Sequence, residues 1–123
     1  MRTLLFSAFL ILMGSCAPPD RDCKQFQEGT FRFDAIVDGK EETTIFTRSK
    51  TLEVSEHLGK VDSASIRWIN DCEYIVTNLN PQGPGEEKPI HMKILSTTGD
   101  SYTFEYKFVG SSKSSRGTAY KME

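Results

Sequence analysis

Apolar and polar residues alternate with a period of two through most of the chain after residue 30, and this pattern limits the possible folds most strongly. In a β-strand, successive side chains point to opposite faces, so such spacing collects the apolar side chains on one face. The pattern is clearest in residues 30–37 and 101–108, whose alternate positions are Phe31, Phe33, Ala35 and Val37 in the first and Tyr102, Phe104, Tyr106 and Phe108 in the second. It predicts an all-β domain.

Turn signals divide this pattern into about eight short strands in sequence order. Asp38-Gly39, Leu58-Gly59, Asn70-Asp71 and Gly99-Asp100 are expected reversals. The expected strands are residues 30–37, 42–48, 50–57, 64–68, 72–77, 90–94, 102–108 and 117–122. Short connections favour an antiparallel meander that closes as a lipocalin-like up-and-down barrel, and a curved open sheet or a two-sheet sandwich is the alternative. No helix is expected after the N-terminal segment.

The interior of such a barrel is either filled by side chains or holds one small ligand, and the sequence leaves both open. Eight aromatic rings stand at alternate strand positions and are numerous enough to fill the interior: Phe31, Phe33, Trp68, Tyr74, Tyr102, Phe104, Tyr106 and Phe108. The Pro- and Gly-rich segment 80–88 is the longest expected loop. It is either a mobile connection or a binding loop.

The first 16 residues have the layout of an export signal. Arg2 precedes an apolar run at residues 4–13, and two small residues then lead into Cys16. This run of ten residues, all apolar except Ser7, is well short of the roughly 20 that a membrane-spanning helix needs. A signal cut just before a cysteine resembles the bacterial lipoprotein signal, in which that thiol is acylated. We therefore predict a signal peptide at residues 1–15 and a lipid on Cys16.

Cleavage there removes the first 15 of 123 residues and leaves 108, enough for one domain with a modest core. Residues 16–28 form the predicted tether and lead segment, and residues 29–123 the single β domain. Without Arg2 the chain has 14 basic and 17 acidic residues, a net charge of −3 with both histidines neutral. This charge gives no reason to expect nucleic-acid binding.

The three cysteines agree with export. If Cys16 carries the lipid, Cys23 and Cys72 remain as an even pair in a compartment where disulfides persist. We predict that they form a disulfide, with two free thiols as the alternative. A metal site is not expected, because two isolated cysteines and two scattered histidines lack the close ligand pairs of zinc motifs.

Two groups of residues resemble a known family. Cys23, Phe26 and Gly29-Thr30-Phe31, followed by the segment from Trp68 to Tyr74, are similar to paired signatures of small, uncharacterised envelope lipoproteins of Bacteroidetes-type bacteria. The resemblance implies a place in the cell envelope, in the outer membrane, on either its periplasmic or its surface face. Some relatives carry an automatic label of DNA topoisomerase IV, which an exported, acidic and short chain contradicts.

No catalytic or cofactor motif is present in the sequence. His57 and His91 are the candidates for a general base near neutral pH, but the strand pattern places them outward or at a strand end. Ser111 and Lys113 share a Ser-rich turn, and the acid pairs Glu41-Glu42 and Glu86-Glu87 fit solvated loops. We expect no enzyme, no catalytic residue, and no cofactor apart from the lipid on Cys16.

The sequence therefore favours a lipid-anchored binding module that holds a small apolar ligand in a barrel. A structural or interaction protein that acts through its surface on another envelope protein is the alternative, and an enzyme ranks third. The membrane is the expected partner, through the lipid.

Overall fold

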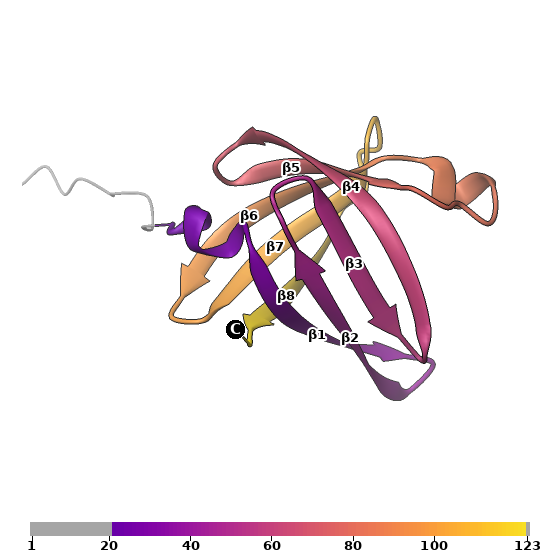
Figure 1. Ribbon diagram of the computed structural model, residues 1–123, viewed down its shortest axis with the longest axis horizontal. Coiled ribbons are helices and arrows are strands. Elements are labelled where there is room, and N and C mark those ends of the chain that lie inside the picture. The colour runs from indigo at the N-terminus through magenta and orange to yellow at the C-terminus, as the bar shows by residue number, and fades with distance from the viewer. Residues whose placement is uncertain (1–20, 123) are drawn as a thin grey trace, which may run out of the picture.

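The structure, a computed structural model, describes residues 21–122 and contains eight antiparallel strands that close into a barrel (Figure 1). Each strand pairs with the next, and the last returns to the first, so the predicted lipocalin-like up-and-down meander is confirmed over the open-sheet and sandwich alternatives. The strands are β1 Gly29–Val37, β2 Lys40–Arg48, β3 Leu52–His57, β4 Lys60–Asn70, β5 Glu73–Asn78, β6 Ile90–Thr98, β7 Ser101–Phe108 and β8 Ser115–Lys121.

The predicted alternation is the inward-outward alternation of the barrel wall. Its buried core includes Phe26, Phe31, Phe46, Ile94, Tyr102, Phe104 and Ala119. The ring stripe of β7 changes along its length, because Tyr102 and Phe104 are buried whereas Phe108 at the far end is 45% exposed. The core therefore fills one end of the barrel more completely than the other.

The barrel closes unevenly along two seams. β1 and β8 pair at only three positions, Phe31 to Phe33 against Lys121 to Ala119, and β5 pairs with β6 at four. Gly117 lies beside the first seam, where a Cβ atom would approach the ring of Phe33 to 2.7 Å and that of Phe104 to 2.8 Å. Glycine thus allows these two rings to meet edge to face, with centroids 5.5 Å apart.

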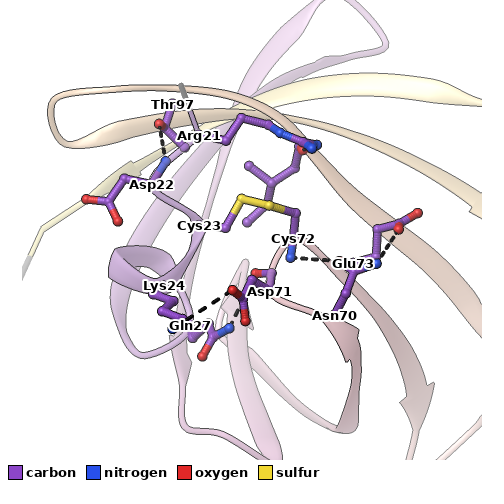
Figure 2. Close-up of a disulfide and its surroundings, with 11 residues drawn as sticks. Arg21, Asp22, Cys23, Lys24, Gln27, Asn70, Asp71, Cys72, Glu73 and Thr97 are labelled. Atoms are coloured by element: carbon purple, nitrogen blue, oxygen red, sulfur yellow. Dashed lines mark hydrogen bonds and ion pairs between the residues drawn. A yellow bond between two sulfur atoms is a disulfide. The ribbon is translucent and has the colours of Figure 1, made fainter. Parts of the chain in front are cut away.

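One end of the barrel is covered by a short 3-10 turn, η1 at Cys23–Phe26, joined by a disulfide from Cys23 to Cys72 (Figure 2). The sulfurs are 2.06 Å apart, which confirms the predicted pair. Cys23 and Phe26 are buried, so this part of the predicted lead segment belongs to the core. Lys121 Nζ also donates to the Gln25 carbonyl. We call this end the closed end.

Three local expectations are wrong. Residues 21–122 form two 3-10 turns where no helix was expected: η1, and η2 at Pro84–Glu87 in the long loop. Cys72 lies in the β4–β5 turn and not at a strand start, because the Asn70 side chain accepts the Cys72 backbone N–H at 2.9 Å and reverses the chain one residue later. β3 begins at Leu52, not at residue 50.

Candidate ligand-binding site in the barrel

The floor of the barrel interior is organised by Arg48, the last residue of β2, whose exposed fraction is only 3%. Its Nη1 donates to the Phe26 carbonyl of η1 at 2.8 Å, and its Nη2 donates to the hydroxyls of Tyr74 and Tyr102 at 2.8 and 3.0 Å. Its Nε donates to Glu53 Oε2 on β3 at 3.1 Å. One side chain therefore connects the closed end to three strands of the barrel wall, β3, β5 and β7.

The surroundings of Arg48 keep the guanidinium charged. Burial by itself would lower the pKa of Arg48, but the nearby tyrosine hydroxyls and the Glu53 carboxylate outweigh it and raise the pKa. Burial also raises the pKa of Tyr74 and of Tyr102, with the positive charge of Arg48 opposing it in both. Both phenols are thus neutral at ordinary pH and act as hydrogen-bonding groups.

Aromatic rings surround the same guanidinium. Its central carbon lies 4.8 Å from the ring centroid of Tyr74, 5.0 Å from that of Phe31 and 5.3 Å from that of Phe46. Such contacts favour a cation over ring faces and are strongest where water is excluded. Together with the Glu53 carboxylate, they compensate for the cost of burying the charge.

Next to this floor lies a cavity of about 310 Å³ inside the barrel. One wall, from β1, β6 and β7, is apolar or aromatic, and the other, from β2 and β3, carries most of the polar groups. The lining residues are Phe33, Ile90, Met92, Tyr102, Phe104 and Tyr106 on the first wall and Thr44, Phe46, Arg48, Glu53 and Ser55 on the second. The interior is therefore not completely filled by its rings.

The cavity continues toward the end of the barrel opposite η1, which we call the open end. A hollow of about 360 Å³ there shares Glu53, Ser55 and Ile90 with the cavity and is bordered by Gly85 and Glu86 of the η2 loop. Of the two alternatives for segment 80–88, its position beside the cavity favours a binding loop. A second hollow, of about 470 Å³, lies where β1 and β8 separate and shares Phe33 and Tyr106 with the cavity.

Both predicted histidine candidates contact carboxylates. His57, at the end of β3, places Nε2 at 2.9 Å from Glu42 Oε2 and Nδ1 at 3.1 Å from Thr44 Oγ1, and so bridges β3 to β2 near the open end.

His91 places Nε2 at 3.3 Å from Glu73 Oε1. A hydrogen bond from Asn70 is the largest influence that lowers the pKa of Glu73. Within residues 21–122, neither histidine bonds to Ser111 or Lys113.

Other predicted site residues are placed as follows. Cys16 and the signal lie outside the described residues, so lipidation stays a prediction. Cys23 and Cys72 meet at the closed end. In the described part of the chain, no three metal-ligating side chains gather, and no helix is long and apolar enough to cross a membrane.

Sequence reasoning missed the Arg48–Glu53 pair. Thr44, Phe46 and Arg48 are alternate residues of one strand and all point inward. This period of two was the signal that could have identified Arg48 as an interior residue. On the next strand, Leu52 and Val54 alternate as one apolar face, but that face is outward, and the two residues are 40% and 37% exposed. Glu53 and Ser55 therefore point inward, into the cavity.

No family model, curated protein or solved structure matches the chain.

Proposed function

We propose that this protein is a lipid-anchored component of the bacterial cell envelope whose barrel binds one small, mainly apolar ligand. The observation that supports ligand binding most directly is the cavity of about 310 Å³ between the Arg48 floor and the open end. Ligand sites are typically concave, mostly apolar, and supplied with a few convergent polar groups. The cavity has this composition, and the barrel gives it a fixed shape.

The size and polarity of the cavity define the ligand class. With roughly 30 Å³ for a water-sized group, it holds a molecule of about ten non-hydrogen atoms. The aromatic wall suits a hydrocarbon body, while the Ser55 hydroxyl and the Glu53 carboxylate of the polar wall suit a polar head group. A medium-chain alcohol or acid has this shape, and the alcohol suits a wall on which the charges of Arg48 and Glu53 already offset each other.

Uptake of a fluorescent medium-chain fatty acid, and of the matching alcohol, tests this proposal. We expect saturable binding of one molecule per chain. Ser55→Trp fills the cavity and should weaken binding at least about tenfold. Val54→Trp is the matched control, because the neighbouring side chain on the same strand points outward. Absence of uptake of both probes, or equal binding by the two variants, would contradict the proposal.

The anchor is supported by the sequence around Cys16 and by the formed Cys23–Cys72 disulfide, which leaves Cys16 as the remaining thiol. One acyl chain binds a membrane only weakly, whereas the two or three chains of a processed lipoprotein hold it stably. Such an anchor would place the protein in the envelope, and the resemblance noted above favours the outer membrane.

Cys16→Ser tests the anchor. Metabolic labelling with palmitate should mark the native protein and be lost in the variant, which should also leave the membrane fraction or remain unprocessed. Cys72→Ser is the control, because it replaces a cysteine and breaks the disulfide without removing the lipid site. Labelling that persists in Cys16→Ser would disprove the assignment.

A further inference from the structure

The turn between β3 and β4 places a leucine where both its backbone and its side chain are unfavourable. Leu58 has φ +51° and Gly59 φ +78°, and Leu58 is 79% exposed. Two-residue hairpin turns with positive φ at both positions prefer Asn, Asp or Gly at the first. The turn between β1 and β2 has the same two φ values with Asp38 and Gly39. Folding alone thus gives no reason for leucine at position 58.

The neighbouring β1–β2 hairpin also exposes apolar residues beside its turn. Both hairpins point to the open end, and their inner strands β2 and β3 are paired neighbours (Figure 1). We define the hairpin-tip surface as Ile36, Val37, Leu58 and Val61, whose exposed fractions are 73%, 43%, 79% and 61%. Four exposed apolar residues on two adjacent hairpins are more than the single exposed apolar residues that protein surfaces normally carry.

The two hairpins are held in a fixed relation. His57 contacts Glu42 and Thr44 at 2.9 and 3.1 Å, so the tip of the β3–β4 hairpin is connected to strand β2 of the other hairpin. A surface that is already ordered loses less conformational entropy on binding.

Charges around the surface indicate the kind of partner. Residues 36–42 and 54–62 contain five carboxylates and two lysines, a net charge of −3 with His57 neutral. An anionic lipid surface would repel this region, whereas a basic protein surface would attract it.

The position of the surface also separates it from the N-terminal segment. The described chain begins beside η1 at the closed end, opposite the hairpin tips (Figure 1). Cys16 precedes Arg21 by five residues, a reach of at most about 18 Å. Whatever Cys16 is attached to therefore lies near the closed end and leaves the tips accessible.

We infer that the hairpin-tip surface docks a partner protein whose apolar pocket is bordered by lysine or arginine side chains. Leu58 is the central anchor that enters this pocket, and the surrounding carboxylates meet the basic border. Interfaces commonly combine an apolar centre with a polar rim in this way. The inference stands independently of ligand binding in the cavity.

Photo-crosslinking of the full chain in its native cells tests the inference, with the crosslinking amino acid at Ile36. We expect one protein adduct, and the captured protein, once purified, should bind this chain less tightly as salt increases. Leu58→Asn should weaken that binding at least about tenfold. Ile69→Asn, an exposed apolar position near the closed end, is the matched control and should change it less than about twofold.

Stability provides a second readout that does not need the partner. Leu58→Asn suits the positive φ and should raise the melting temperature by roughly 4 °C, so weaker binding cannot be ascribed to unfolding. The inference is overturned by a lower melting temperature, by the absence of an adduct, by an adduct with a second copy of this chain, or by equal binding of the two variants. Binding of anionic phosphatidylglycerol vesicles that Leu58→Asn abolishes would also overturn it, in favour of a membrane.

Discussion

Arg48 has a structural role that a neutral side chain of similar length would not fill. Its donors satisfy the Phe26 carbonyl, two tyrosine hydroxyls and the Glu53 carboxylate, and all of these residues except Glu53 are buried. Removing the cation would leave these acceptors without their donor. Breaking one half of a buried ion pair costs about 3–5 kcal/mol, more than the pair itself contributes to stability.

We predict that Arg48→Met lowers the free energy of unfolding by about 3 kcal/mol, measured by urea denaturation. The double variant Arg48→Met/Glu53→Leu should recover part of this loss, because it removes the carboxylate that the single variant leaves unpaired. A loss below about 1 kcal/mol for the single variant would show that the Arg48 contacts contribute little.

Single residues are also where sequence reasoning is weakest. Alternation identifies which residues share a face, as for Leu52 and Val54, but not which face points inward when charged and apolar residues compete. Here the inward face of β3 is the one that carries Glu53 and Ser55. Glu53 pairs with Arg48, and Ser55 lines the cavity. These are contacts between strands, which no local pattern contains.

Strands and their turns could be predicted well because their signals are local. The Asp38-Gly39 and Leu58-Gly59 turns occur where expected, and the meander order follows from short connections. The 3-10 turn η1 could not be predicted, because it depends on a disulfide and on hydrogen bonds to distant strands, such as that of Asp22 to Thr97 (Figure 2).

The disulfide is the strongest constraint on the closed end. It joins residues 49 positions apart, for which the chain-entropy model gives about 4 kcal/mol of stabilisation. Its pairing could be predicted from cysteine arithmetic alone. Its consequence, that η1 covers the barrel and places Phe26 against Tyr102 with centroids 5.0 Å apart, required the three-dimensional arrangement.

The whole molecule has two different ends. The closed end contains η1, the disulfide and the start of the described chain, and the hairpin tips lie at the open end (Figure 1). The route into the cavity is also at the open end. If Cys16 carries a lipid, the closed end lies toward the membrane and the open end faces away from it. A ligand would then enter from the aqueous side or from a docked partner.

The central claim, that the ligand lies inside the barrel, is tested most directly by nuclear magnetic resonance of the isotope-labelled chain titrated with decanol. Saturable changes in amide shifts are predicted at Thr44, Ser55 and Met92, which line the cavity, with little change at Leu58 and Val61. No saturable change, or changes confined to the hairpin-tip surface, would contradict the account.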